Sequence, residues 1–427
     1  MTGDQGSTYH AEFHLKSGID AWKGGDAPTA LVCFQRARKL GHAHPRLHYW
    51  LALTLLALGR KDEAWLETET LLRLAPTDVT GRVMRDRLQA PAGRGKGKRI
   101  ALHMNRLYHY AIVQPLYELL CADHDVLLTF EPIELTAFKP DVVVVCDTQA
   151  ANLRTLLPDA VSVCVMHGVT GSKNLVQRGG LAADHLCVAS GYIADRLGRH
   201  HKVRDEKFWI TGYIETDPLF RRNHVPIPID IPPSHKTVLY APTYNPGLSS
   251  VPVLGDRLAE LIIGQRDDIC VITRPHPNII ERNPQWLAWF RGASARNSNF
   301  HLIEDMGLPM AALMLAADAI VSDSSNCAFQ FLALDRPIVL IDALDREQAG
   351  ESFEAGSIEW AWRDVGEGVK DVSDLASAVG RSLNDPTLGA DRRAFYRAKL
   401  FGDLTDGRAA ERVAMNIENL ELKRETR

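Results

Sequence analysis

The sequence predicts an α/β protein in which two Rossmann-like lobes follow an all-α domain of helical repeats. Two observations predict the lobes: short apolar runs alternate with helical stretches from residue 99 onward, and a proline-rich stretch divides that series in two. A third predicts the repeats, because residues 1–90 show internal similarity at a fixed period. Alternating strands and helices indicate βαβ units and parallel sheets, and a chain of 427 residues suits roughly three domains.

The N-terminal region repeats itself. Four pairs of small or apolar residues lie thirty-four positions apart: Gly25 and Gly59, Ala30 and Ala64, Ala37 and Leu71, and Leu40 and Leu74. This is the tetratricopeptide period, so two helix pairs are expected within residues 9–89, with an ordinary helical hairpin domain as the alternative. Two repeats leave an apolar face unstacked where stable arrays have three or more. We therefore expect this domain to bind a protein partner or a second copy of the chain, and to be separable.

Residues 91–98 are predicted to form a basic, glycine-rich linker. Their glycines differ from a phosphate-binding loop in two ways. The run precedes the apolar residues 100–104, whereas a dinucleotide fingerprint follows its strand. Arg99 also stands where the Walker pattern needs Ser or Thr.

The two lobes are expected at residues 99–230 and 231–427, separated by the prolines between Pro226 and Pro233. In the first lobe the predicted strands are Ile100–Met104, Val126–Phe130, Val142–Cys146, Val161–Met166, Leu186–Ala189 and Phe208–Ile210. In the second they are Val238–Ala241, Ile269–Thr273, Phe300–Ile303, Ala319–Ser322 and Ile338–Ile341, followed by helical segments from Val372 to Leu422. Two doubly wound lobes that face a cleft are the expected outcome.

Composition narrows the class of protein. A net charge of −4 gives the chain no overall attraction to nucleic acid. Residues 1–10 lack the apolar core of a signal peptide, and no apolar run is long enough for a membrane span, so a cytoplasmic location is expected. Seven cysteines without a Cys-x-x-Cys pair predict neither a disulfide framework nor a zinc site. No metal is expected.

Polar residues follow four of the predicted strands, at the carboxyl ends where open α/β sheets bind ligands. They are His167, Gly168, Lys173 and Asn174 after residues 161–166, Thr243 after residues 238–241, Arg274 and His276 after residues 269–273, and Ser322, Asp323, Ser324, Ser325 and Asn326 after residues 319–321. A small polar turn that opens a helix favours a phosphate, because its N–H groups are free and the helix dipole attracts anions. A plain N-cap is the alternative.

His276 lies between two prolines that make its turn rigid. Arg274 beside it can hold a diphosphate by a bidentate contact. A rigid turn suits an imidazole that faces a ligand, whereas a packed or solvated histidine is the alternative at a strand end.

Taken together, these strand ends resemble the CDP-glycerol glycerophosphotransferase family, which includes teichoic-acid polymerases and primases. The matching segments follow the family's order and spacing over residues 160–342: Val165-Met-His-Gly168, Val238-Leu-Tyr-Ala-Pro-Thr243, Arg274-Pro-His-Pro277, Ala317-Asp-Ala-Ile-Val-Ser-Asp-Ser-Ser325, Phe329 and Leu334-Asp-Arg-Pro337. The helical repeats lie outside the resemblance.

The resemblance implies a glycosyltransferase-B architecture and a transferase. Such an enzyme moves a glycerophosphate or related phosphoalditol from a CDP-activated donor to a hydroxyl acceptor, lipid- or polymer-linked, in cell-surface polymer synthesis, with loss of CMP. No cofactor beyond this donor co-substrate is implied. Catalytic roles carry over to His167, which we expect to be the general base, and to His276. Implied donor contacts are Thr243, Arg274, Ser322, Asp323, Ser324, Ser325 and Asn326, and candidate acceptor contacts are Gly168, Lys173 and Asn174.

Three departures from the family pattern bear on the identity of the donor. Ser324 and Asn326 replace a tyrosine and a serine of the family's turn, and Gln330 replaces an aspartate. The family's Gly-x-Pro-Arg-x-Asp segment occurs here as Gly212-Tyr-Ile-Glu-Thr-Asp217.

Two other functions stay open. A glycosyltransferase that uses a nucleotide sugar has the same architecture, and Glu351 and Glu359 have the Glu-x7-Glu spacing of some retaining enzymes, although a charged segment gives this spacing by chance. The other is a non-catalytic scaffold whose repeats grip a partner, against which the retention of both histidines argues. Peripheral attachment at the inner face of the cell membrane is a further option for the location.

Overall fold

The computed structural model describes residues 3–42, 44–90, 97–146, 150–166, 168–169, 179–342 and 356–422. The chain divides into two compact units. The first contains residues 1–144 and 155–160, and the second contains residues 145–154 and 161–427.

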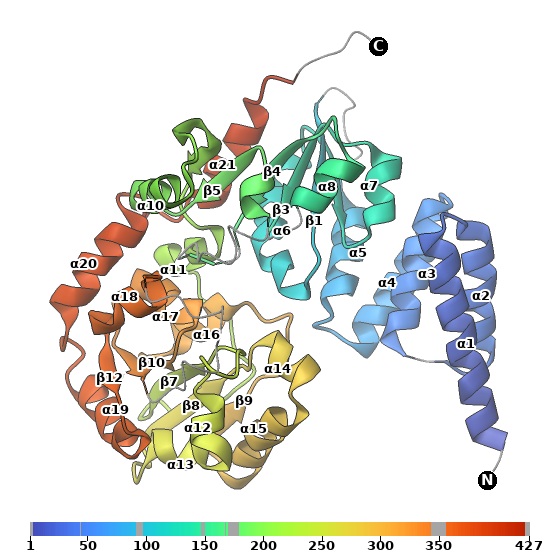
Figure 1. Ribbon diagram of the computed structural model, residues 1–427. Helices are drawn as coiled ribbons and strands as arrows, with labels where there is room; N and C mark the ends of the chain where they lie inside the picture. Colours follow the sequence, from blue (N-terminus) through green and yellow to red (C-terminus); the bar gives the residue numbers. More distant parts are fainter. Residues whose placement is uncertain are drawn as a thin grey trace. The chain divides into compact units, whose positions relative to one another are not determined.

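The first unit begins with helices, drawn in blue in Figure 1. They are α1 (Gly3–Lys23), α2 (Ala27–Lys39), α3 (Pro45–Ala57), α4 (Lys61–Leu74) and α5 (Val79–Gln89). Gly25 and Gly59 make the turns of the hairpins α1–α2 and α3–α4 at φ values of +82° and +75°, a conformation that glycine adopts without strain. Ala30 and Ala64 are fully buried where the helices approach. The all-helical region expected within residues 9–89 is confirmed, whereas its assignment as tetratricopeptide repeats stays a prediction.

Helix α5 joins the helical region to the α/β part of the same unit. Arg87 donates two hydrogen bonds to Glu134, of 3.1 and 2.7 Å, and both side chains are largely buried. The Tyr110 hydroxyl donates to the carboxylate of Asp86 at 2.6 Å, and Tyr117 donates to the Asp86 carbonyl at 3.2 Å. These contacts oppose the expectation of a separable domain, because truncation before residue 99 would remove Asp86, to which both tyrosines donate, and the arginine that pairs with Glu134.

The first sheet has six strands in the order β2-β1-β3-β4-β5-β6. They are β1 (Arg99–His103), β2 (Asp125–Thr129), β3 (Val142–Val145), β4 (Val161–Val165), β5 (His185–Val188) and β6 (Phe208–Ile210). Its helices are α6 (Tyr110–Leu120), α7 (Pro132–Phe138), α8 (Ala150–Leu156), α10 (Gly191–His201) and α11 (Asp217–Arg221). All four residues of β3 are buried valines, as expected of a parallel strand covered on both faces.

The second sheet, in the second unit, has the strand order β12-β11-β10-β7-β8-β9. Its strands are β7 (Lys236–Ala241), β8 (Ile269–Thr273), β9 (Phe300–Leu302), β10 (Ala319–Ser322), β11 (Ile338–Ile341) and β12 (Glu367–Val369). Renumbered from β7, this is the 3-2-1-4-5-6 order of the Rossmann fold, which reverses between β7 and β10. The predicted architecture of two doubly wound parallel sheets is confirmed. Among the strands of the described residues, only β12 was not predicted.

Helices cover the second sheet and then return to the α10–α11 region (Figure 1). Those of the sheet are α12 (Val251–Leu254), α13 (Leu258–Ile263), α14 (Pro277–Arg282), α15 (Pro284–Arg296), α16 (Met310–Ala316), α17 (Asn326–Phe331), α18 (Ile358–Ala361) and α19 (Leu375–Asn384). The last two are α20 (Ala390–Phe401) and α21 (Ala409–Glu418). The Ser190 hydroxyl at the start of α10 donates to the Lys399 carbonyl at 2.9 Å. The end of the chain therefore contacts elements that precede residue 231.

Candidate active site

Three strand ends of the second sheet meet at the point where its strand order reverses. Ala241 of β7 pairs with Ser322 of β10, and Tyr240 pairs with Thr273 of β8. The residues that follow these strands, Pro242-Thr243, Arg274 and Asp323, therefore emerge at the same edge. Doubly wound sheets bind their ligands at this edge, at the switch point.

Asp323 organises this edge. Its carboxylate accepts hydrogen bonds of 2.8 Å from the N–H of Thr243 and from both the N–H and the hydroxyl of Ser250. The Ser322 hydroxyl donates to the Ala241 carbonyl at 2.7 Å, and both Ser322 and Asp323 are fully buried. Burial raises the pKa of Asp323, and the hydrogen bonds oppose that rise. Asp323 thus holds the loop after β7 and Ser322 holds the end of that strand, whereas Ser324, Ser325 and Asn326 are partly exposed. The donor contacts predicted for this turn stay predictions.

Arg363, which the sequence did not single out, holds the same turn from the other side. Its guanidinium donates to the carbonyl of Asp323 at 2.6 Å and to the carboxylate of Asp342 at 2.6 Å. An arginine in a segment without a strand-end motif gives no signal of this contact in the sequence.

Arg274 lies inside the protein next to the turn. The side chain is buried and one guanidinium nitrogen donates to the Leu308 carbonyl. Burial lowers the pKa of Arg274, while Cys327, Glu215 and Asp305 oppose this effect. Arginine stays protonated in proteins, so Arg274 places a buried cation beside the strand ends, and its predicted contact with the donor stays a prediction.

His276 is the N-cap of α14. Its Nδ1 accepts the N–H of Asn278 at 3.1 Å, and its ring contacts that of Tyr244 in a tilted arrangement, with 4.5 Å between centroids and 37° between the ring planes. In the neutral imidazole the proton therefore sits on Nε2, which makes that nitrogen a donor. Pro277 occupies the first helical position, where its missing N–H costs nothing.

The turn at the start of α17 is polar and partly exposed. Ser325 caps the helix by accepting the N–H of Cys327 at 3.3 Å, and the Ser324 hydroxyl donates to the Leu248 carbonyl at 3.4 Å. A Cβ atom on Gly168 would lie 2.9 Å from Nδ2 of Asn326, so the backbone of the predicted His-Gly motif approaches this turn. His167, Lys173 and Asn174 lie outside the described residues, and their predicted roles stay predictions.

Two of the departures from the family pattern are neighbours. Gln330 of α17 donates to the Tyr213 hydroxyl at 3.2 Å and to the Glu215 carboxylate at 3.3 Å. Tyr213 in turn donates to the same carboxylate. These residues are more than a hundred positions apart, and no periodicity links them.

Neither a metal centre nor a membrane span is found within the described ranges. They contain no group of three or more His, Cys, Asp or Glu side chains placed to hold a metal ion. None of the helices in this part of the chain is both long and apolar enough to cross a membrane. Glu359 is buried on α18, whereas Glu351 falls in a stretch that the structure does not describe, so the Glu-x7-Glu spacing stays untested.

Known proteins share both the sequence pattern and the fold. The teichoic acid glycerol-phosphate transferase of Staphylococcus aureus is 24% identical over 247 residues, which cover 55% of this chain and 60% of that protein. The teichoic acid glycerol-phosphate primase of Bacillus spizizenii is 25% identical over 162 residues, covering 36% of this chain and 39% of the primase. These matches span less than two thirds of either relative.

A solved structure and a family model complete the comparison. The wall teichoic acid polymerase TagF aligns with a TM-score of 0.55 at 14% identity, over 85% of this chain and 97% of that one, which establishes a similar two-sheet fold of the glycosyltransferase-B type. The family described as CDP-Glycerol:Poly(glycerophosphate) glycerophosphotransferase matches residues 134–419, more than half of the chain. The chain therefore belongs to the CDP-glycerol:poly(glycerophosphate) glycerophosphotransferase family.

Proposed function

We propose that the chain transfers a glycerophosphate or related phosphoalditol from a CDP-activated donor to a hydroxyl acceptor during synthesis of a cell-surface polymer. The observation that carries this proposal is the convergence of Thr243, Arg274 and residues 324–326 at the switch point of the second sheet. Family membership and the names of the relatives, a glycerol-phosphate transferase and a primase, support the choice of donor.

In this proposal the diphosphate of the donor lies over Ser324, Ser325 and Asn326. N–H groups at the start of a helix bind anions, and Arg274 supplies the positive charge from beneath. Asp323 contributes indirectly, because it fixes the Thr243 backbone against the turn. These groups neutralise a diphosphate without a metal ion, so we expect turnover to persist in excess EDTA. Abolition by EDTA with rescue by Mg²⁺ would contradict this part.

The chemical step is an attack by the acceptor's hydroxyl oxygen on the β-phosphorus. A new P–O bond forms as the bond to the bridging oxygen breaks, and CMP leaves with that electron pair. The hydroxyl proton passes to a general base, the role proposed for His167. His276 would donate from Nε2 to the phosphate or the leaving group, because Nδ1 is held as an acceptor by Asn278.

Two measurements on the whole chain test the proposal. Thermal-shift screening against CDP-glycerol, CDP-ribitol and nucleotide sugars identifies the stabilising donor. Turnover of that donor is then measured from the amount of CMP released. Release of UDP or GDP would instead support the nucleotide-sugar glycosyltransferase. Absence of turnover with every stabilising donor would support the scaffold.

Histidine variants test the mechanism. Loss of a general base lowers turnover by about 10²–10⁴-fold, so we expect this from His167→Ala with nearly unchanged donor affinity. His276→Ala should weaken both turnover and affinity. His224→Ala, at an exposed position, is the matched control. Near-normal turnover of His167→Ala with a raised KM would assign the base to another residue.

The proposal includes an acceptor carried on a lipid or growing polymer, a cytoplasmic or membrane-peripheral location, and a protein partner or second copy on the helical region. Exposed aromatic side chains on α1 support such an association, since Tyr9 and Phe13 are 73% and 57% exposed. Sedimentation at increasing concentration, with Tyr9→Ser and Phe13→Ser as disrupting variants, distinguishes self-association from a heterologous partner.

A further inference from the structure

We infer that Glu215 is a specificity-determining residue. Its carboxylate selects donors whose terminal phosphate is esterified to an uncharged, hydroxyl-bearing group, here called capped donors. The inference rests on the proposed function, because it names the part of the donor that this side chain contacts. Its basis is a cluster of three side chains, Tyr213, Glu215 and Gln330, the last of which lies on α17, the helix that begins at the proposed phosphate site.

The cluster fixes the direction of the Glu215 carboxylate. Oε2 accepts hydrogen bonds from the Tyr213 hydroxyl and from Nε2 of Gln330, the latter at 3.3 Å. Tyr213 and Gln330 are buried, whereas Glu215 is partly exposed. Burial, followed by the charge of Glu215, raises the pKa of Tyr213, so the phenol stays protonated and keeps donating. Two buried donors therefore orient the carboxylate of a residue that is itself partly exposed.

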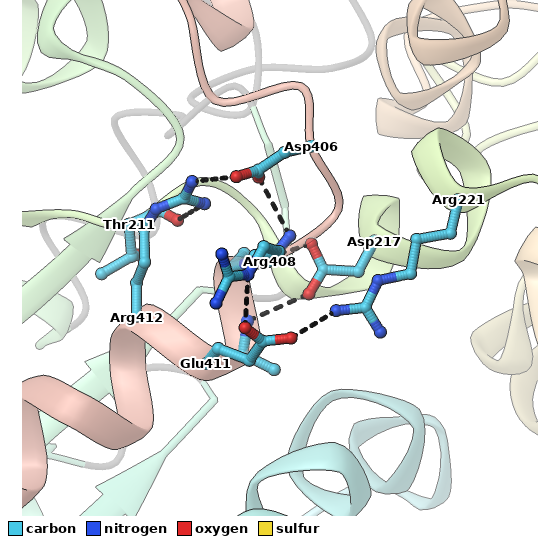
Figure 2. Close-up of polar contacts among 9 residues, drawn as sticks. Thr211, Asp217, Arg221, Asp406, Arg408, Glu411 and Arg412 are labelled. Atoms are coloured by element: carbon cyan, nitrogen blue, oxygen red, sulfur yellow. Dashed lines mark hydrogen bonds and ion pairs between the residues drawn. The ribbon is translucent and has the colours of Figure 1, made fainter.

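The backbone that carries Glu215 is fixed as well. Figure 2 shows the carboxylate of Asp217 at the start of α21, where it accepts the N–H groups of Ala409 and Ala410 at 2.9 and 3.0 Å. At the other end of the segment, Gly212 has a φ of +88°, and a Cβ atom there would lie 3.1 Å from the Cβ of Ala409. Glu215 thus sits on a short segment held at both ends.

An outer layer of ion pairs surrounds this contact (Figure 2). Arg221 of α11 donates to Glu411 of α21 at 2.8 Å, and Arg408 binds the same carboxylate. Arg412 binds Asp406 and also donates to the Thr211 carbonyl at 3.4 Å. The segment and α21 are therefore joined by backbone as well as side-chain contacts.

The charge of Glu215 acts on the residues of the proposed phosphate site. It raises the pKa of Arg274 against the lowering by burial, and it adds to the rise that burial causes for Cys327, in the first turn of α17. Ionised phosphates have no proton to donate and are repelled by a carboxylate. A hydroxyl group donates to a carboxylate strongly. A part of the donor that contacts Glu215 beside a bound diphosphate should therefore carry a hydroxyl group.

The position of Glu215 in the chain indicates which hydroxyls these are. The nucleotide is proposed to lie on the strand ends of the second sheet, whereas Glu215 comes from the segment between β6 and α11. The backbone of Gly168, which follows β4, also approaches Asn326 from outside the second sheet. Residues from this side meet the transferred end of the donor, where the acceptor attacks. Bare CDP ends there in a phosphate with an extra negative charge, and CDP-glycerol ends in hydroxyls.

The experiment compares capped donors with their bare diphosphates by calorimetric titration of the full chain. The ligands are CDP-glycerol, CDP-ribitol, CDP, UDP-glucose and UDP. Glu215→Gln removes the charge and keeps the shape, and Tyr213→Phe removes one of the orienting donors. Glu260→Gln, exposed on α13 and paired with Arg257, is the matched control. Thermal unfolding of each variant confirms that it is folded.

We expect Glu215→Gln to weaken the capped donor about tenfold or more, the loss typical of a hydrogen bond to a charged group, and to leave bare CDP unchanged or bound more tightly. Tyr213→Phe should lower the affinity for the capped donor relative to that for bare CDP by a smaller factor. Glu260→Gln should leave this ratio of affinities unchanged. An equal loss for CDP and CDP-glycerol would place Glu215 against the ribose or give it a structural role, and no change would remove it from the site. Either result overturns the inference.

The titrations of the wild-type chain test the proposed function separately from the role of Glu215. If the wild-type chain binds UDP-glucose and no CDP compound, the proposed donor is wrong, and the UDP-glucose to UDP ratio in Glu215→Gln still decides the role of Glu215. If it binds none of the five ligands, both proposals are overturned.

Discussion

Asp217 links the last helix of the chain to the segment that carries Glu215, and replacing it with alanine tests that link. The substitution removes the acceptor of two buried N–H groups, those of Ala409 and Ala410. Each buried donor left without a partner costs about 1–3 kcal/mol. Burial raises the pKa of Asp217, because removing the charged carboxylate from water costs free energy. Alanine relieves this desolvation cost, which offsets part of the lost stability. We therefore expect a net destabilisation of about 2–4 kcal/mol.

Hydrogen exchange measured by mass spectrometry locates the effect. Amides of α21 should exchange about thirtyfold faster or more in Asp217→Ala, since 1.4 kcal/mol is a factor of ten. The matched control is Glu411→Ala in the same group of contacts, because the Glu411 side chain is 36% exposed and pairs with the side chains of Arg221 and Arg408, and surface ion pairs contribute only about 0–1 kcal/mol. Equal exchange of α21 in the two variants would refute the argument that Asp217 anchors this helix.

Three further predictions follow from single contacts. Arg87→Ala should lower the free energy of unfolding by about 3 kcal/mol, because it removes the cation that pairs with the largely buried Glu134 carboxylate, and an unchanged melting temperature of this variant would contradict the prediction. Truncation of residues 1–98 should unfold the first unit, which a truncated chain with an unchanged melting temperature would refute. Burial lowers the pKa of His103 from 6.5 to about 4, so the unfolded chain binds the proton more readily and stability should rise by about 3 kcal/mol as pH increases from 4 to 6.5. His103→Gln should remove this part of the pH dependence, as measured by urea unfolding at each pH. Gly168→Ala should weaken donor binding several-fold with little loss of stability, because a Cβ 2.9 Å from the Asn326 amide displaces a flexible side chain; an unchanged calorimetric affinity would separate Gly168 from the donor site.

Most of the α/β fold was predictable because parallel strands are buried on both faces. Runs such as Val142–Val145 and Ile338–Ile341 are continuously apolar and completely buried, so they stand out from the amphipathic helices between them. β12 was not predictable, since Glu367-Gly-Val369 is short and only Val369 is buried. The docking of α5 was missed for a related reason. Charged residues such as Asp86 and Arg87 indicate a solvent face, and their partners lie on α6 and α7.

The candidate site was predictable where parallel topology alone determines position. Thr243, Arg274 and the turn from Ser322 follow three neighbouring strands, so their meeting at one edge follows from the strand order. The function of individual side chains was not predictable in the same way. In the sequence Asp323 is a candidate ligand contact. In the structure the loop after β7 folds back, and the N–H groups of Thr243 and Ser250 donate to the Asp323 carboxylate.

The contact between Glu215 and Gln330 was not predicted from the sequence. Both positions depart from the family pattern, and in the sequence each departure bears only on the identity of the donor. The structure shows that they are in contact at 3.3 Å. A new group at one position therefore alters the hydrogen bonds and charge at the other.

The segment from Gly212 to Asp217 connects three parts of the second unit that are far apart in sequence. Asp217 binds the start of α21, Tyr213 and Glu215 bind Gln330 in α17, and α17 begins at the turn proposed to hold the donor phosphates. If these contacts act as one body, a change at α21 reaches that turn through this segment. Asp217→Ala should then weaken capped donors in the same direction as Glu215→Gln while sparing bare CDP. Loss of α21 protection with an unchanged donor ratio would show that the segment holds Glu215 without help from the C-terminal helix.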